Sequence, residues 1–330
     1  MELKENLMQR GAMKLARDCG SVTEQDIAVI VCDYASFEVA NLVAQACLAL
    51  GACTNMLIFE PTERHGAPVP DMVGAAMEKA TVAFLITTKS MSHTPAVKMA
   101  RAAGCRIVTM PEVYPHMLIK GAIQADFPAR AIVAEKTKAL LTRAKTARIV
   151  CEETGTDISF VLEGRTGRAL TGIAKEPSSF ACPPNIEACL APVEEKTNGV
   201  FVVNASIAGV GATTEPVKVT VKDGVIRSIE GGADAEQLRQ ILTKPNNPNC
   251  FRIGELGIGL NPCAIPCGSL LEDEAPLGTV HIAAGNNASN FPGGQVSAPV
   301  HIDMIAKGAT VYIDDIAILK NGEFQDNVLD

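Results

Sequence analysis

The stretch DIAVIVCDYASFEVANLVAQACLALGACTNMLIFEP, residues 26–61, contains a complete strand–helix–strand pattern. Continuous apolar runs at residues 26–33 and 54–61 flank a longer segment whose apolar residues recur at helical spacing. Continuous apolar strands that alternate with amphipathic helices are typical of a parallel sheet covered on both faces. The stretch therefore predicts the start of a doubly wound α/β domain.

The same alternation continues to about residue 150. Strand-like runs follow at residues 81–88 and 105–111, helical segments at 70–80 and 93–104, and a longer helix is expected from about Pro128 to Thr146. The first strand is not followed by a G-x-G-x-x-G or G-x-x-x-x-G-K-[ST] loop, so no nucleotide is expected. We predict a Rossmann-like domain over residues 1–147 that is a scaffold or supplies one wall of a cleft.

After residue 148 the apolar residues change to a period of two. Turn pairs such as Asp223-Gly224 and Asn321-Gly322 lie between alternating runs, which is a strong hairpin signal. Residues 148–330 are therefore predicted to form a mainly antiparallel β domain, with one short helix at about Ala233 to Thr243. The expected fold class is α/β, with these two domains in sequence.

Bulk properties exclude several partners. A chain of 330 residues is long enough for two cores, and a net charge of -8 with no basic stripe argues against nucleic acid. The apolar runs are too short or too interrupted to span a bilayer, and residues 1–20 lack the pattern of a signal peptide, so no membrane and a cytoplasmic location are expected. The eleven cysteines are scattered, and the C-x3-C pair Cys263 and Cys267 has no second pair to complete a zinc site.

Two of the five histidines fall inside predicted strands of the second domain. His301 and Asp303 in VHIDMIAKGATVYIDD, residues 300–315, are two apart, so on an extended strand they face the same side and can converge on one ion. A hydrogen-bonded core histidine is the alternative for this pair. His281 in GTVHIAAG and Glu255 in FRIGELGIGLNP add two more ionisable groups in apolar strands. Because buried ionisable groups normally pair or bind metal, these four residues predict an oxygen and nitrogen metal site.

Other polar residues have weaker signals. Asn286, Asn287 and Asn290 follow a predicted ligand strand and form either a substrate-contacting loop or a turn. Arg165 and Arg168 are either a receptor for a substrate carboxylate or solvated surface residues. The run from Glu272 to Glu274 is expected to be a solvated acidic loop.

The order G-E-L-G-I-G-x-N-P, G-T-V-H-I-A-x-G and H-I-D-M-I resembles the C-terminal half of the aminopeptidase T and S metallopeptidases, a family that includes the related 2,5-dihydroxypyridine 5,6-dioxygenases. The likeness covers most of the chain in domain order, with its specific motifs after about Asn185. It implies metal ligands at Glu255, His281, His301 and Asp303. It adds Glu187 in PNIEACLAP, a segment shorter than its peptidase counterpart.

The two branches of the family imply different chemistry. The dioxygenase pattern has a histidine at the position of Glu255 and no ligand at that of His281, so these two residues favour the peptidase set. Conversely, the peptidases have a tyrosine where this chain has Ala288, and the chain is nearer to the dioxygenases in length.

The resemblance therefore leads us to expect a metal-dependent hydrolase that cleaves an amide bond in a small substrate, a short peptide or a cyclic or non-peptide amide. One or two divalent ions, Zn, Mn or Co, would activate water, with Glu255 or Glu187 as general base. The alternative is a non-haem Fe(II) dioxygenase that opens a hydroxylated N-heterocycle such as a dihydroxypyridine. A third possibility is a relative that binds metal without catalysis. A homo-oligomer is implied in each case.

Overall fold

The computed structural model describes residues 3–268, 272–289 and 291–329, so Asn290 of the predicted loop lies outside the described residues. The chain divides into two compact units. Unit 1 comprises Met1–Ala131 and Leu170–Asn185, and unit 2 comprises Ile132–Ala169 and Ile186–Asp330. The domain boundary expected between residues 147 and 148 stays a prediction. In the structure, unit 2 begins at Ile132, and the later segment Leu170–Asn185 belongs again to unit 1.

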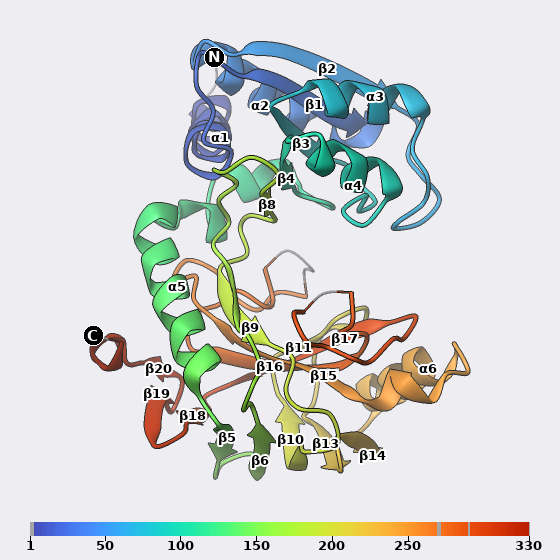
Figure 1. Cartoon of the computed structure of the whole chain (residues 1–330), viewed down its shortest axis with the longest axis vertical. Coiled ribbons are helices and arrows are strands. Elements are labelled where there is room, and N and C mark those ends of the chain that lie inside the picture. Colours follow the sequence, from blue (N-terminus) through green and yellow to red (C-terminus); the bar gives the residue numbers. More distant parts are fainter. Residues whose placement is uncertain (1–2, 269–271, 290, 330) are drawn as a thin grey trace. The chain divides into compact units, whose positions relative to one another are not determined.

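Unit 1 is built on a parallel sheet with the strand order β2-β1-β3-β4-β8 over the described residues (Figure 1). Its strands are β1 Ile27–Asp33, β2 Cys53–Phe59, β3 Val82–Ile86, β4 Arg106–Thr109 and β8 Phe180–Ala181. Its helices are α1 Leu3–Lys14, α2 Phe37–Ala49, α3 Asp71–Lys79, α4 Pro95–Ala102 and the start of α5 Phe127–Arg143.

Helices cover both faces of this sheet. Val29 and Val31 of β1 pack with Val73 and Met77 of α3 and with Val97 of α4. The other face of β1 is packed by α2, which also contacts β2 and α1. Because both faces are covered, the central strands are continuous apolar runs, as the sequence pattern predicted.

Unit 2 contains two antiparallel sheets. Over the described residues their orders are β14-β13-β10-β6-β5-β18-β19-β20 and β12-β11-β17-β16-β15-β9-β7. The first comprises β5 Thr146–Cys151, β6 Thr156–Val161, β10 Asn198–Val203, β13 Val217–Lys222, β14 Val225–Glu230, β18 Thr310–Ile313, β19 Ile316–Lys320 and β20 Glu323–Phe324. The second comprises β7 Arg168–Leu170, β9 Glu187–Leu190, β11 Ser206–Ile207, β12 Gly211–Ala212, β15 Ile253–Gly259, β16 Thr279–Gly285 and β17 His301–Lys307.

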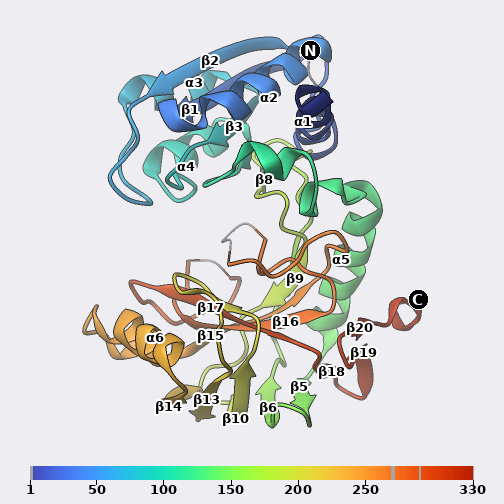
Figure 2. The ribbon, with the colours of Figure 1, turned by 180° about the vertical axis from the view of Figure 1, so that it is seen from behind.

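The two sheets of unit 2 are joined where the chain passes from β17 to β18. Gly308, at φ 74°, makes this connection, and β18 then pairs with β5 of the first sheet. β10 of the first sheet contacts β17 of the second, so the sheets pack on one another. The helix α6 Ala233–Thr243 lies beside β13 and β14 in both views (Figures 1 and 2).

The predicted fold class is confirmed: a doubly wound parallel sheet precedes a mainly antiparallel β region. The predicted hairpin turn at Asp223-Gly224 joins β13 to β14, with both residues at positive φ as a tight hairpin requires. The helix expected to reach Thr146 ends at Arg143, because Thr146 already begins β5. No helix among the described residues is long and apolar enough to cross a membrane.

Candidate metal centre

Five ionisable side chains of unit 2 project from one face of the second sheet. In the register of adjacent strands, Gly257 of β15 lies opposite His281 of β16, and Ala283 lies opposite both Glu255 and Asp303. Glu187 of β9 lies opposite Gly259, and His301 of β17 lies opposite Gly285. Directly opposed residues of a sheet share a face. Glu187, Glu255, His281, His301 and Asp303 therefore point to the same side from four neighbouring strands.

The small residues between them make room for these side chains. A Cβ atom added at Gly257 would lie 2.1 Å from Nε2 of His281. The imidazole therefore occupies the volume that any other residue at position 257 would fill. This explains the second glycine of the GELGIG motif, Gly257, which leaves room for the ring of His281 beside two carboxylates.

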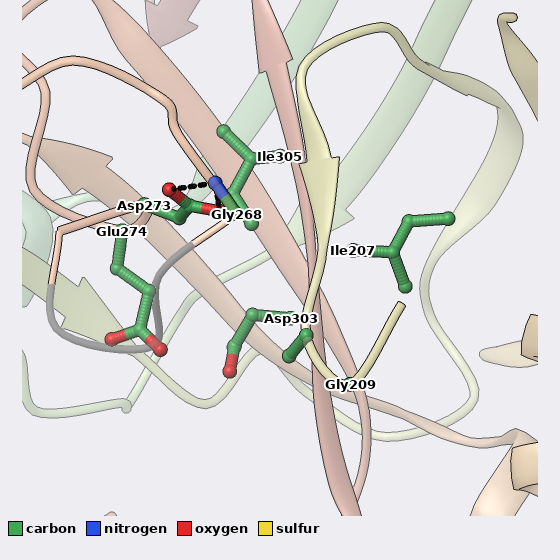
Figure 3. A pocket seen from close by; sticks show the side chains of 8 residues that line it. Ile207, Gly209, Gly268, Asp273, Glu274, Asp303 and Ile305 are labelled. Carbon is green, nitrogen blue, oxygen red and sulfur yellow. Dashed lines mark hydrogen bonds between the residues drawn. The ribbon is translucent and has the colours of Figure 1, made fainter. Parts of the chain in front are cut away.

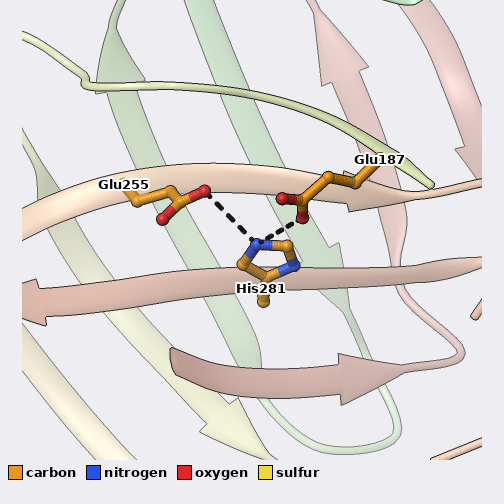
Figure 4. A group of neighbouring side chains, drawn as sticks. All are labelled: Glu187, Glu255 and His281. Carbon is orange, nitrogen blue, oxygen red and sulfur yellow. Dashed lines mark ion pairs between the residues drawn. The ribbon is translucent and has the colours of Figure 1, made fainter. Parts of the chain in front are cut away.

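Glu187, Glu255 and His281 form the deeper part of the cluster (Figure 4). Nε2 of His281 lies 3.2 Å from Oε2 of Glu187 and 3.5 Å from Oε1 of Glu255. His281 is 0% exposed, and the two glutamates are 2% and 4% exposed. Both carboxylates thus point at the same ring nitrogen from opposite sides, out of contact with solvent.

Glu255, His301 and Asp303 form the outer part. Nε2 of His301 lies 2.7 Å from Oε2 of Glu255 and 3.4 Å from Oδ1 of Asp303. Nδ1 of His301 donates a hydrogen bond to the carbonyl oxygen of Asn286 at 2.7 Å, because a carbonyl only accepts. In the neutral ring, Nε2 is then the nitrogen with a free lone pair. Glu255 belongs to both parts, with one oxygen facing each histidine.

The charges of the cluster are strongly coupled. Burial opposes the charged form of His281, but the contacts with Glu255 and Glu187 outweigh it and raise its pKa to about 9. Burial also opposes charge on His301, yet the carboxylates of Asp303 and Glu255 raise its pKa well above the usual value. The two histidines in turn hold the pKa of Glu255 well below its usual value despite burial. The metal-free cluster is thus stabilised by protons held on its histidines.

This arrangement fits a divalent cation. Within the described residues, the buried Nδ1 of His281 has no hydrogen-bond partner, and Nε2 of His281 and Oδ1 of Asp303 face other ionisable atoms of the cluster at 3.2–3.5 Å. A buried polar atom without a partner is costly unless an ion binds it. One ligand atom from each member of either group of three lies within 4.8 Å of the others. Imidazole and carboxylate donors suit Zn, Mn and Fe alike, so the donor set does not select among them.

The side chain of Cys189 lies beside the cluster and was not identified from the sequence. Cys189 lies two residues after Glu187 on β9, and its thiol donates to Oε1 of Glu187 at 3.8 Å. Burial and the charge of Glu187 raise the pKa of that thiol well above its usual value. The i, i+2 spacing of Glu187 and Cys189 on a strand would have been the signal.

The acidic segment from Glu272 to Glu274 is not the solvated loop that the sequence indicated. Asp273 is buried and accepts hydrogen bonds from the backbone of Cys267 and Gly268. Glu274 lines the same cavity as Asp303, and burial together with the charge of Asp303 raises the pKa of Glu274 well above the usual value. Figure 3 shows both carboxyl groups at a small cavity with Ile207 and Ile305, which has room for one water-sized molecule at most. Nothing in the sequence connects Glu274 with Asp303, because the contact depends on how the loop folds back.

The remaining candidate residues from the sequence are Arg165, Arg168 and Asn287. Arg165 is buried, paired with Glu194 and bonded to the carbonyl of Gly293, so it is not a solvated residue. The guanidinium of Arg168 lies 5.5 Å above the ring of Phe291, whose centroid is 6.2 Å from that of His301. Asn287 is fully buried, accepts a hydrogen bond from the backbone of Val296 and donates one to Glu194.

Comparison with known proteins decides the family. The family model for 2,5-dihydroxypyridine 5,6-dioxygenase matches residues 12–326, which is nearly the whole chain. The chain belongs to the 2,5-dihydroxypyridine 5,6-dioxygenase family. A curated member from Pseudomonas putida strain KT2440 is 25% identical over 255 residues, which cover 73% of this chain and 70% of that protein.

Solved structures agree on the fold. The 2,5-dihydroxypyridine dioxygenase from Pseudomonas putida KT2440 superposes with a TM-score of 0.80 at 21% identity, over 98% of both chains. AmpT from Thermus thermophilus superposes with a TM-score of 0.67 at 16% identity, over 97% of this chain and 99% of that one. The chain therefore shares its fold with AmpT, and the dioxygenase branch is the one that matches by sequence.

The expectation of a metal-dependent amide hydrolase is wrong. The family match over residues 12–326 and the curated dioxygenase relative overturn both that reaction and the metallohydrolase class. The error lay in choosing the reaction from Glu255 and His281. Carboxylate and imidazole ligands serve hydrolytic and oxidative metals equally well, so two ligand positions do not fix the chemistry.

Proposed function

We propose that this chain is a non-haem Fe(II) dioxygenase that opens the ring of a hydroxylated N-heterocycle such as a dihydroxypyridine. The observation that carries the proposal is the family match over residues 12–326, together with a buried imidazole and carboxylate cluster on one sheet face. A small aromatic substrate is consistent with an enzyme of this family. The identity of the metal as iron is part of the proposal.

His301, Asp303 and Glu255 are the residues that we assign as iron ligands. They form the outer group, and His301 is partly exposed while the inner group is sealed from solvent. Bound iron would supply activation of dioxygen and a binding point for the substrate hydroxyl. The set has one histidine and two carboxylates, whereas the common facial triad of non-haem iron enzymes has two histidines and one carboxylate.

Glu187 and His281 hold a proton in this proposal. Nε2 of His281 lies between the carboxylates of Glu187 and Glu255, and the raised pKa of His281 keeps its ring charged at neutral pH in the metal-free cluster. The pair thereby fixes the orientation of Glu255, whose other oxygen faces His301.

Metal analysis and oxygen uptake test the proposal together. Protein purified without chelator is analysed for metals, then loaded anaerobically with Fe(II), Mn(II) or Zn(II) and mixed with 2,5-dihydroxypyridine in an oxygen electrode. We expect about one iron per chain and oxygen uptake with Fe(II) alone. Turnover of the heterocycle without oxygen uptake would contradict the reaction, and two ions per chain would contradict the proton assigned to His281.

Self-association and a cytoplasmic location stay predictions. Light scattering of the purified full chain tests the first, with a mass of one chain as the contradicting result.

A further inference from the structure

A buried network links the loop after β16 to the histidine at the start of β17. Arg165 is 8% exposed, and its guanidinium donates to the carboxylate of Glu194 and to the carbonyl of Gly293. Oε1 of Glu194 accepts from the backbone nitrogen of Gln295 at 3.0 Å and from Nδ2 of Asn287 at 3.3 Å. The ion pair therefore contacts the loop at three separate residues.

The loop closes on Asn287, which is 0% exposed. Oδ1 of Asn287 accepts from the backbone nitrogen of Val296 at 2.7 Å, and the backbones of these two residues pair at 2.9 Å. The neighbouring Asn286 is fixed by its backbone nitrogen, which donates to the carbonyl of Val300 at 2.7 Å. Gly294 packs so closely that an added Cβ would lie 2.5 Å from the carbonyl oxygen of Asn287. The direction of the Asn286 carbonyl is thus set by the closed loop.

That carbonyl is the partner of Nδ1 of His301, at 2.7 Å. A histidine ligand commonly donates its second ring N–H to a carbonyl or carboxylate, which fixes the tautomer and the ring orientation. We infer that Arg165 and Glu194 are positioning residues: through their contacts with Asn287, Gly293 and Gln295 they fix the ring of His301 so that Nε2 faces Glu255 and Asp303.

Two features of the Arg165–Glu194 ion pair fit a positioning role. Arg165 and Glu194 are both largely buried, with side chains 9% and 15% exposed, and burying two charges costs free energy that a simple loop anchor does not require. A planar guanidinium also makes two directed bonds at once, here to a carboxylate and to a carbonyl, which a lysine does not reproduce. Neither residue is itself one of the five clustered side chains.

The inference rests on the proposed function in one respect, because it takes His301 as a metal ligand. The test uses Co²⁺ alone as a spectroscopic probe with the full chain, its affinity measured by titration of the visible absorption. The hyperfine-shifted ring N–H proton of His301 is followed by NMR and distinguished from that of His281 by its persistence in H281Q. The variants are R165K and E194Q, since glutamine keeps the shape of Glu194 and an acceptor for Gln295.

The matched controls are R148K and D157N. Arg148 and Asp157 also form an arginine–carboxylate ion pair in unit 2, with two contacts of 2.8 Å, but they are exposed and lie on β5 and β6 of the other sheet. We expect R165K and E194Q to weaken Co²⁺ binding about tenfold, as loss of outer partners of metal ligands does, and to speed exchange of the His301 N–H with water. The controls should change neither quantity.

The possible outcomes distinguish the positioning role from the proposed metal site on which it rests. Wild-type affinity and N–H exchange in a folded R165K or E194Q overturn the positioning role, whatever the effect on thermal stability. If R165K does not fold, E194Q decides alone. A wild-type chain that binds no Co²⁺ refutes the proposed metal site, and with it the inference, whereas normal binding in wild type and variants refutes the inference only.

Discussion

Buried charges are handled differently in the two units. In unit 1, Asp26 at the start of β1 is 6% exposed, and its carboxylate contacts Arg106 at 2.9 Å, Thr81 at 2.6 Å and the backbone of Thr23 at 2.8 Å. In unit 2, His281 is 0% exposed, and its Nε2 lies between the carboxylates of Glu187 and Glu255 at 3.2 and 3.5 Å. A guanidinium is always charged and balances Asp26 by itself, whereas an imidazole balances buried carboxylates only when it holds a proton or when a cation binds.

The largest expected difference between the two regions is in activity. We expect H301A or D303A to reduce oxygen uptake to below about 1% of wild type, since loss of outer partners alone already costs about 10- to 100-fold. D26N is the matched control in unit 1: it should lower the free energy of unfolding by about 1–3 kcal/mol and leave kcat unchanged. Steady-state kinetics with denaturant unfolding measures both quantities. Wild-type kcat in H301A would contradict the assignment of ligands.

Replacing one glycine by alanine in each unit tests how closely neighbouring atoms pack around it. In G257A the new Cβ would collide with Nε2 of His281, and we expect a loss of about 1–3 kcal/mol in the free energy of unfolding together with weaker metal binding. In G74A, on helix α3 of unit 1, the nearest atom is 3.5 Å away, and alanine should stabilise the helix by about 0.5–1 kcal/mol. Equal effects of the two substitutions on metal affinity would show that position 257 does not shape the site.

The stability of the metal-free chain and the stabilisation that metal adds should change with pH in opposite directions. The raised pKa of His281 means that its stabilising contribution is full below its ordinary pKa of 6.5 and is lost as pH rises through about 9. Glu255, with its lowered pKa, contributes above its ordinary value of 4.5 and loses that contribution only as pH falls through the lowered one. With EDTA, Tm should therefore fall between pH 6.5 and pH 9.

Bound metal competes with those protons, so the rise in Tm that it causes should grow over the same pH range. Thermal unfolding in paired samples measures the effect. A Tm increment from metal that shrinks as pH rises would contradict the cluster as the binding site.

The smallest expected effect is at Glu274. Its raised pKa indicates a neutral carboxyl group beside Asp303, and glutamine is neutral with a similar shape. We therefore expect E274Q to change stability by no more than about 0.5 kcal/mol and to leave metal affinity unchanged. A large loss of affinity, measured by metal titration, would show instead that Glu274 acts as a charged ligand.

The architecture was predictable from the sequence because the apolar residues of each half recur at a regular spacing. The continuous runs of β1 and β3 and the alternation of β13 and β14 follow directly from which faces are buried. The short β8 was not predicted, because two residues have no period, and it joins the parallel sheet only by tertiary pairing with β4.

Part of the candidate site was predictable from the alternation of side chains along a strand. His301 and Asp303 share a strand, so their convergence follows from the i, i+2 rule, whereas the approach of Glu187 to His281 depends on the register of β9 and β15. Glu274 was missed because its loop has no local signal. The reaction was not predictable from these residues, since the same oxygen and nitrogen ligands bind redox-inert and redox-active metals.

The fate of molecular oxygen tests the central claim most directly. The Fe(II)-loaded full chain is incubated with 2,5-dihydroxypyridine under ¹⁸O₂, and the ring-opened product is analysed at once by mass spectrometry. A dioxygenase site on this sheet face predicts that both atoms of ¹⁸O₂ enter the product, and that H301A abolishes their incorporation. Product whose new oxygen comes from water, or product formed equally without oxygen, would contradict the account.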